Sequence, residues 1–313
     1  MTQNENEITI EKWLKRSVNL LEIKGIRTAR LDNLIILEHT LNIPKYKILA
    51  QLEMIIPADL IFVLKKKLIL RYLGEPIAYI TQKKEFYGRQ FYIDNNVLIP
   101  RPDSEKIIDL TKYIINNLRN DANYQKSINL LDEDTTILDK SLKIVKESIT
   151  KEKSYKDIYL ADIGTGSGVL GVTMQLEIPN IVVDLIDISK NALKTALVNV
   201  NKFATKNLLI EDNLLENNET SYHILIANLP YVPLNYSTSN EIKFEPFSSI
   251  FALSNGIAIY EKLVQQIRDK SFKPLYIIIE KIPIQDNKIL NIFNNIGYFP
   301  VFLSDFTIVF GRM

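Results

Sequence analysis

The sequence predicts an α/β protein in which a small helical bundle and a linking β-hairpin precede a Rossmann-like sheet domain. Three observations lead to this fold class. Apolar residues recur at helical spacing from Ile8 to Leu73, and the spacing becomes alternating after Gly74. An apolar run typical of a buried strand leads into a glycine-rich loop at residues 164–168. Further short apolar runs end in polar residues, as strands of open α/β sheets do at their ligand-binding edge.

Composition indicates a globular protein and argues against several kinds of chemistry. The 313 residues are 46% hydrophobic and 24% charged, which suffices for two domains with a sizeable core. There is no cysteine for a disulfide or thiolate, and two histidines are too few for a histidine-based metal site. The net charge of +1 gives no electrostatic footprint for nucleic acid, so we expect no direct nucleic-acid binding.

The sequence also gives no sign of a membrane or export segment. No apolar run reaches the roughly 18 residues of a membrane span. Residues 1–10 are polar and acidic, unlike a signal peptide. We therefore expect a cytoplasmic protein that binds neither membrane nor metal, and we expect it to be a monomer.

The first domain, residues 1–75, is predicted to be a bundle of four or five short helices. Apolar residues at three- and four-residue spacing form one helix face between residues 31 and 41 and another between residues 61 and 73. Pro44 and Pro57 mark breaks between helices.

Residues 76–100 are predicted to form a hairpin that links the two domains. Ile77 and Tyr79, followed by residues 86–93, have the alternation of two strands, and residues 94–96 form the next turn. The second domain, residues 101–313, follows this linker.

The second domain begins with a segment that contains two prolines, which hold Arg101 in an extended conformation. Asp103 or Ser104 is expected to cap a helix over residues 106–119 that carries Glu105 in its first turn.

Residues 120–157 are polar and mixed in charge. This composition predicts an exposed insertion at about 120–154 that contains one helix around residues 136–149. We assign it no function.

The glycine-rich loop predicts a ligand site. Glycines at alternate positions let the backbone approach a ligand closely and leave amide N–H groups pointing outward at a helix N-terminus. A dinucleotide fingerprint requires a third glycine where Val169 stands, so the pattern favours S-adenosylmethionine over NAD. The next strand, residues 181–186, ends at Asp187, whose carboxylate can accept hydrogen bonds from both ribose hydroxyls. This spacing indicates a class I methyltransferase.

A second site is predicted at residues 224–233, where a buried strand stops at two prolines. The side-chain oxygen of Asn228 can accept one N–H of a planar NH2 group, and a neighbouring main-chain carbonyl can accept the other. Pro230 fixes the direction of the Leu229 carbonyl in part, because it biases Leu229 toward extended backbone. The ring of Tyr231 can cover the face of the group.

Five motifs occur along the chain, in the order Gly74-Glu75-Pro76, Pro100-Arg101-Pro102-Asp103-Ser104-Glu105, Asp162-Ile163-Gly164-Thr165-Gly166-Ser167-Gly168, Asp187-Ile188-Ser189 and Asn228-Leu229-Pro230-Tyr231. With them, the chain resembles the protein-(glutamine-N5) methyltransferases that modify peptide-chain release factors, the PrmC/HemK family. The resemblance runs from about Arg30 to the C-terminus and includes Phe244-Glu245-Pro246 and residues 280–285. The Pro-Arg-Pro block is its most specific part, because general methyltransferases lack it.

The resemblance implies methyl transfer from S-adenosylmethionine to the glutamine of the Gly-Gly-Gln motif of class I release factors, which dock on the helical domain. It implies a cofactor site made by Gly164, Thr165, Gly166, Ser167, Gly168, Asp187, Asp212, Asn213 and Asn228. It implies that the substrate amide is held by the catalytic residues Asn228, Leu229, Pro230 and Tyr231, with Arg101, Glu105 and Glu245 also on the substrate side.

Three departures from the family pattern bear on substrate identity. Leu229 stands where the family has proline, which removes one conformational lock but keeps the carbonyl. Ser104 replaces the usual threonine and keeps the hydroxyl. The spacing between the Pro-Arg-Pro block and the glycine loop is longer than in the family.

Three other functions stay open at this point. Asn-Leu-Pro-Tyr also occurs in ribosomal RNA adenine dimethyltransferases, and an exocyclic amine presents the same two donors. Glutamine methylation of a ribosomal protein is the second alternative. The third is a catalytically inactive protein that docks on release factors or ribosomes.

Overall fold

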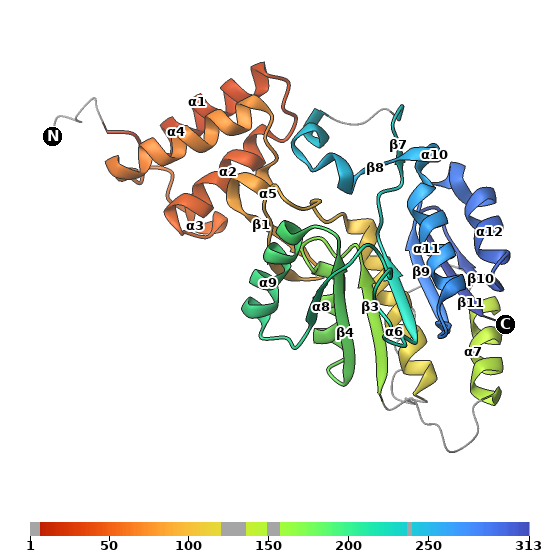
Figure 1. Cartoon of the computed structure of the whole chain (residues 1–313). Helices are drawn as coiled ribbons and strands as arrows, with labels where there is room; N and C mark the ends of the chain where they lie inside the picture. The colour runs from red at the N-terminus through yellow and green to blue at the C-terminus, as the bar shows by residue number, and fades with distance from the viewer. Residues whose placement is uncertain (1–6, 120–135, 149–156, 237–239, 313) are drawn as a thin grey trace. The chain divides into compact units, whose positions relative to one another are not determined.

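The computed structural model describes residues 7–119, 136–148, 157–236 and 240–312 (Figure 1). The chain forms two compact units. The first runs from the N-terminus to Lys83 and takes in the 3-10 helix η2 (Asn240–Phe244), and the second contains the rest. The division into a docking domain, a linker hairpin and a methyltransferase domain stays a prediction.

The first unit is the predicted helical bundle. Its helices are α1 (Ile10–Ile23), α2 (Ala29–Leu41), α3 (Lys45–Ala50), α4 (Ala58–Leu73) and α5 (Ile77–Thr81). Pro44 and Pro57 immediately precede α3 and α4, as expected for residues whose fixed φ suits a helix start. The core of the bundle is aliphatic apart from Trp13, with Ile10, Leu21 and Ile36 fully buried.

A buried arginine ties η2 into this unit. Arg71 of α4 donates from Nε to Asp32 over 2.6 Å and from Nη2 to Glu241 over 2.6 Å. Its Nη1 donates to the carbonyl of Glu75. The pKa of Arg71 is raised, because the two carboxylates outweigh the opposing effect of burial. η2 thus belongs to the helical unit, although the chain before and after it belongs to the second unit.

The hairpin is shorter than predicted. The prediction that its first strand includes Ile77 and Tyr79 is wrong. Ile77 and Tyr79 lie in the helix α5, which begins directly after Pro76 and is closed by a hydrogen bond from Thr81 Oγ1 to the Ile77 carbonyl. The hairpin itself consists of β1 (Lys83–Phe86) and β2 (Arg89–Tyr92). Two apolar residues at alternate positions are too short a run to distinguish a strand from one helical turn.

The second unit is built on a seven-stranded sheet. Its strands are β3 (Ile158–Ile163), β4 (Ile181–Asp187), β5 (Leu208–Glu211), β6 (Ile224–Ala227), β9 (Tyr276–Glu280), β10 (Tyr298–Leu303) and β11 (Thr307–Arg312), in the spatial order β10-β11-β9-β6-β3-β4-β5. Pairing is parallel from β9 to β5, whereas β11 is antiparallel to β9 and β10. This is the predicted Rossmann-like fold. The strand order reverses between β3 and β6, which is where such sheets bind ligands.

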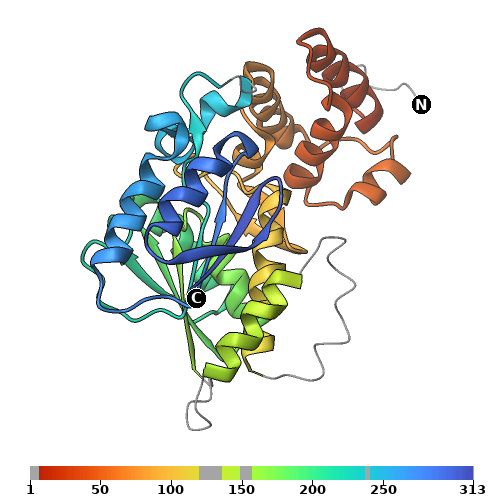
Figure 2. The ribbon, with the colours of Figure 1, turned by 90° about the vertical axis from the view of Figure 1, so that its right-hand side faces the viewer.

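Helices cover both faces of the sheet, so its central strands are buried on both sides (Figure 2). On one face lie α6 (Glu105–Leu118), α7 (Thr136–Ser148), α8 (Val169–Glu177) and α9 (Lys190–Phe203); on the other lie α11 (Ala258–Asp269) and α12 (Asp286–Asn294). The predicted helix near residues 136–149 is confirmed as α7, while the flanks of the predicted insertion fall outside the described residues. Shorter elements are η1 (Pro102–Ser104), β7 (Val232–Pro233), η3 (Phe247–Ser249), β8 (Phe251–Ala252), α10 (Leu253–Gly256) and η4 (Pro283–Gln285).

Candidate active site

The site lies at the carboxyl edge of the sheet, where four neighbouring strands end level with one another. Ile163 of β3 pairs with Ile186 of β4 and with Ala227 of β6, and Ala227 pairs with Ile279 of β9. The next residue of each strand is therefore at the same height. These residues are Glu280, Asn228, Gly164 and Asp187, read across the sheet from β9 to β4.

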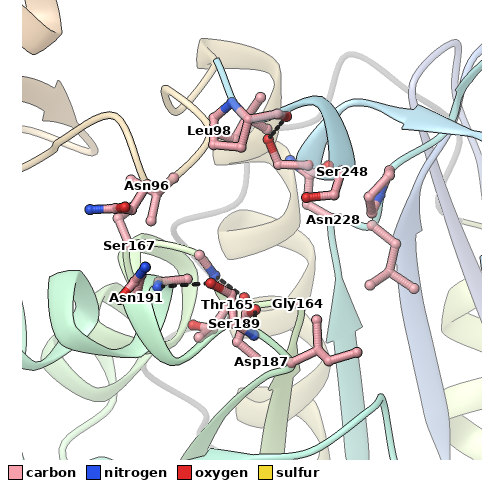
Figure 3. A pocket seen from close by; sticks show the side chains of 18 of the residues that line it. Asn96, Leu98, Gly164, Thr165, Ser167, Asp187, Ser189, Asn191, Asn228 and Ser248 are labelled. Carbon is pink, nitrogen blue, oxygen red and sulfur yellow. Dashed lines mark hydrogen bonds between the residues drawn. The ribbon is translucent and has the colours of Figure 1, made fainter. Parts of the chain in front are cut away.

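A cavity of about 510 Å³ opens above this edge and contains most of the predicted site (Figure 3). The predicted residues that line it are Gly164, Thr165, Gly166, Ser167, Asp187, Asp212, Asn213, Asn228, Leu229 and Pro230. In Figure 3, Asp187 and Ser189 lie beside the glycine loop, while Asn228 lies with Ser248 on the other side of the cavity. The lining does not include the other predicted site residues, Gly168, Tyr231, Arg101, Glu105 and Glu245.

The glycine loop differs from the prediction in one respect. The N–H groups of Gly164 and Thr165 donate to the Ile186 carbonyl, and the N–H of Gly166 donates to Asp187 Oδ2. The Gly168 N–H also donates within the loop. These four amides therefore do not point outward, because β4 and the loop itself use them. A pyrophosphate would need such donors, so the loop suits a ligand without phosphate.

Two carboxylates shape the loop. Asp162 is buried and accepts from Thr165 Oγ1 over 2.6 Å and from the Gly171 N–H over 2.9 Å, and burial raises its pKa to about 6. Asp187 accepts from the N–H groups of Gly166 and Ser189. Burial raises the pKa of Asp187, against the effect of these hydrogen bonds. The backbone of Ile188 is a third donor to Asp187, so of the roughly four lone pairs of the carboxylate one is left for a ribose hydroxyl.

Leu229, the departure from the family pattern, packs against the glycine loop. Its side chain is 3% exposed. A Cβ atom on Gly164 would lie 2.7 Å from Leu229 Cδ2, so the absence of a side chain at Gly164 leaves room for the Leu229 side chain in this position. A proline at this position would restrict the backbone. Leu229 instead packs its side chain between the glycine loop and the Asn-Leu-Pro-Tyr segment.

Asp212 and Asn213 follow β5 and line the cavity. Both oxygens of Asp212 accept hydrogen bonds, from the N–H groups of Asn213 and Asn217 and from Asn217 Nδ2. The Asp212 carboxylate therefore stabilises the loop after β5, in which Asn213 lines the cavity.

Asn228 has one free hydrogen-bonding atom. Its Nδ2 donates to Ser104 Oγ over 3.1 Å. Its Oδ1 is buried and has no partner among the described residues, although a buried polar atom is normally paired. An acceptor in this state beside an open cavity suits a donor on a bound molecule.

Ser104 does not cap the following helix, which corrects the prediction. No side-chain cap is formed at the start of α6, and Ser104 has helical backbone angles there. Its buried hydroxyl is instead used by Asn228.

Arg101, Glu105 and Glu245 hold the walls of the site. Glu245 is buried and accepts from the Ile99 N–H over 2.9 Å and from Arg101 Nη2 over 2.5 Å. It thereby joins the two segments that flank the cavity. Glu105 accepts from the N–H of Tyr87, in the turn of the hairpin. A direct substrate role for these three residues stays a prediction.

Sequence reasoning missed Glu280, a buried carboxyl behind Asn228. Tyr231 Oη donates to Glu280 Oε2 over 3.3 Å, and Tyr260 Oη donates to the Glu280 carbonyl over 2.5 Å. Burial raises the pKa of Glu280 to about 7, although hydrogen bonds from Ser104, Tyr231 and Asn228 oppose this. The signal was present: an apolar strand that ends in a polar residue also marks Asp187 and Asn228.

The raised pKa of Glu280 predicts a pH-dependent effect on stability. The carboxyl binds its proton more tightly in the folded state than at the ordinary value of 4.5, so its favourable contribution is complete below pH 4.5 and is lost as the pH rises through about 7. Glu280→Gln should therefore gain stability relative to the wild type by up to about 3 kcal/mol at pH 8, since one pKa unit is worth about 1.4 kcal/mol. Urea unfolding of both proteins at pH 5 and pH 8 measures this gap. A gap that does not widen with pH would contradict the assignment.

Gln285 was also missed, and it holds the main chain of the Asn-Leu-Pro-Tyr segment. Its Nε2 donates to the carbonyls of Tyr231 over 2.6 Å and Asn255 over 2.9 Å, and its Oε1 accepts from the Ile282 N–H. The Tyr231 ring does not line the cavity, and the predicted stacking on a substrate stays a prediction.

Two family models match the chain. Residues 12–81 match the PrmC N-terminal domain, and residues 132–242 match the methyltransferase small domain. Within the described ranges, no helix is long and apolar enough to cross a membrane. The same ranges contain no cluster of three or more side chains that could hold a metal ion.

Curated relatives carry related descriptions. A bifunctional methyltransferase of Rickettsia typhi is 31% identical over 93% of this chain, which spans 54% of that protein. A release factor glutamine methyltransferase of Mycoplasma mycoides is 29% identical, over 80% of this chain and 78% of that protein. The chain thus spans about half the length of the Rickettsia relatives. A solved structure described as a putative class I S-adenosylmethionine-dependent methyltransferase from Listeria monocytogenes covers 96% of this chain and 88% of its own, at 12% identity and a TM-score of 0.41.

The residues in the cavity fit S-adenosylmethionine. Four amides of the glycine loop are already hydrogen-bonded within the chain, Asp187 can still accept from a ribose hydroxyl, and the unpaired Asn228 Oδ1 lies on the opposite side. The two matched domains stand in the order helical domain, then methyltransferase domain. The chain is thus similar to the PrmC/HemK family of methyltransferases in both of its matched domains and in its curated relatives.

Proposed function

We propose that this protein transfers a methyl group from S-adenosylmethionine to the side-chain nitrogen of the glutamine in the Gly-Gly-Gln motif of class I peptide-chain release factors. The observation that carries the proposal is the buried, unpaired Oδ1 of Asn228 at the edge of the cavity. A primary amide offers the N–H donor that this oxygen lacks. The relatives described as release factor glutamine methyltransferases support the choice of substrate. A translation factor as substrate also suits a cytoplasmic enzyme.

The chain's own residues have mainly to orient a weak nucleophile. The bound sulfonium supplies an activated methyl group. Asn228 Oδ1 accepts one N–H of the glutamine amide and the Leu229 carbonyl accepts the other, which directs the nitrogen toward the glycine loop. Both acceptors also stabilise positive charge that develops on the nitrogen. No strong base is needed before transfer, because the methylated nitrogen is far more acidic and releases its proton to solvent.

Several contacts hold these acceptors in place. The Tyr260 hydroxyl accepts a hydrogen bond from the backbone of Leu229. Gln285 fixes the Tyr231 carbonyl two residues further on. We infer that this bracing substitutes for the missing first proline of the motif.

Transfer of labelled methyl from S-adenosylmethionine to purified class I release factor tests the proposal. We expect label on the wild-type release factor and none after Gln→Ala substitution in its Gly-Gly-Gln motif. Label only on ribosomal RNA or on a ribosomal protein would overturn the substrate assignment. Cofactor binding without any transfer would favour a docking protein.

A further inference from the structure

We propose that Gln266 is a positioning residue for the adenosine part of S-adenosylmethionine, because it fixes the backbone of Leu214 in the wall of the cavity. The inference rests on the cofactor of the proposed function and not on its protein substrate. Gln266 belongs to α11 and does not itself line the cavity, whereas Asn213 and Leu214 do. It therefore acts on the cofactor through the loop that follows β5.

Leu214 has an unusual backbone conformation. Its φ is +66°, in the left-handed region that residues with a Cβ atom rarely adopt. Such a conformation persists only where the surrounding structure fixes it, and it is often found at ligand sites. The Leu214 side chain is 8% exposed and lines the cavity. The position of this apolar group in the cavity wall thus depends on a backbone conformation that leucine does not favour.

The Gln266 side chain holds this conformation from both sides. Gln266 Oε1 accepts from the Leu215 N–H over 2.8 Å, and Gln266 Nε2 donates to the Asn213 carbonyl over 3.1 Å. These two main-chain groups belong to the two peptide planes that meet at the Cα atom of Leu214. Because peptide planes are rigid, their relative orientation sets φ and ψ of Leu214. A rotation of Leu214 out of the left-handed region would break at least one of the two hydrogen bonds.

The loop after β5 lies beside the residue that we assign to the ribose. The Asp212 N–H donates to the Asp187 carbonyl over 3.1 Å, so the loop begins directly next to Asp187. Ile188, the residue after Asp187, also lines the cavity and is 66% exposed. Ligand sites bind flat ring systems mainly through apolar side chains. Leu214 and Ile188 supply such apolar surface for the purine that the ribose carries.

Other contacts between α11 and this loop lie at the protein surface. Lys262 pairs with Glu216 over 3.2 Å, and Lys270 pairs with Glu219 over 2.7 Å. The two carboxylate side chains are 53% and 74% exposed, and ion pairs of this kind contribute little. The two hydrogen bonds of Gln266 are therefore the contacts that fix the cavity wall.

Calorimetric binding of S-adenosylhomocysteine, without release factor, tests the assignment. We expect Gln266→Leu to raise Kd roughly 10-fold, the usual effect of losing one or two hydrogen bonds. Kd for 5′-methylthioadenosine should rise by the same factor, because this compound keeps the adenosine and lacks the amino acid. Gln265→Leu is the matched control and should bind like the wild type, since Gln265 donates to Asp269 of its own helix. A loss confined to S-adenosylhomocysteine, or an equal loss in both variants, would overturn the proposal.

A double variant shows whether Gln266 acts through Leu214. Glycine adopts a left-handed backbone without a penalty. The effect of Gln266→Leu on Kd should therefore be clearly smaller in a Leu214→Gly background than in the wild type. In methyl transfer, Gln266→Leu should raise KM for the cofactor and leave kcat within a few-fold of the wild type. Losses of affinity that multiply in the double variant would mean that Gln266 does not act through Leu214, which overturns the proposal.

Amide hydrogen exchange of the protein without cofactor tests the hydrogen bonds themselves. The Leu215 N–H should be protected in the wild type and should exchange roughly 10-fold faster in Gln266→Leu, while the amides of β3 and β4 stay protected and show that the variant is folded. An unprotected Leu215 amide in the wild type, or unchanged protection in the variant, would overturn the proposal. Neither the exchange nor the binding measurements use release factor, so the role of Gln266 and the substrate assignment can fail independently.

Discussion

Asn228→Ala should lower kcat for methyl transfer by about 10²- to 10³-fold, the usual effect of removing one preorganised hydrogen-bonding group at a reacting centre. The side chain supplies the unpaired buried oxygen beside the cavity. Alanine offers no acceptor, so the substrate amide loses its orientation and the developing charge loses a partner. Single-turnover kinetics with saturating release factor separates this effect from binding.

Asn213→Ala is the matched control, since Asn213 lines the same cavity at the end of β5. Its N–H group, which donates to Asp212, is retained in the variant. We expect weaker cofactor binding and a kcat within a few-fold of the wild type. Equal losses of kcat in the two variants would contradict the assignment of Asn228 to the reacting amide.

Gly256→Ala should destabilise the protein by roughly 4 kcal/mol, which is among the larger effects of single substitutions. Gly256 has φ +85°, and a Cβ there would lie 1.9 Å from the Tyr231 carbonyl oxygen and 2.3 Å from Gln285 Nε2. The first neighbour is main chain and cannot turn away. The segment that carries Asn228 would therefore have to move, so activity should fall with stability.

Gly297→Ala separates the collision from backbone strain. Gly297 has a similar φ of +81° but nothing within 4 Å of the added carbon. It should cost only about 1 kcal/mol, the penalty for a left-handed backbone without glycine. Chemical unfolding of both variants measures the difference. Equal destabilisation would mean that the contact between Gly256 and the Tyr231 carbonyl does not constrain the site.

Most of the fold follows from local patterns. The strands that lead to Asp187 and Asn228 are short apolar runs, and the helix at residues 136–148 has an amphipathic period. Each of these patterns fits only one type of secondary structure. The pattern around Ile77 fits either a strand or a helical turn. The packing of α5 in the helical bundle decides for the helix. Local spacing cannot supply that information.

Site residues could be predicted where the residue type and its place after a strand indicate one role. They could not be predicted where the hydrogen-bond partner comes from a distant segment of the chain. Asp187 and Asn228 line the cavity as expected. The use of Ser104 by Asn228, rather than by the helix that follows it, depends on residues 124 positions apart. The same holds for Glu105, whose carboxylate binds the hairpin, and for Gln285, whose amide binds the Tyr231 main chain. Three amides of the glycine loop, those of Gly164, Thr165 and Gly166, donate to β4, which the spacing of the glycines does not reveal.

The most direct test of the central claim locates the methyl group on the substrate. Release factor should be produced alone, with this protein, and with the Asn228→Ala variant, in cells that lack their own enzyme for this modification, and its peptides analysed by fragmentation mass spectrometry. We predict one added methyl group on the side-chain nitrogen of the Gly-Gly-Gln glutamine only with the active protein. An unmodified glutamine in the presence of folded protein that binds the cofactor would contradict the account.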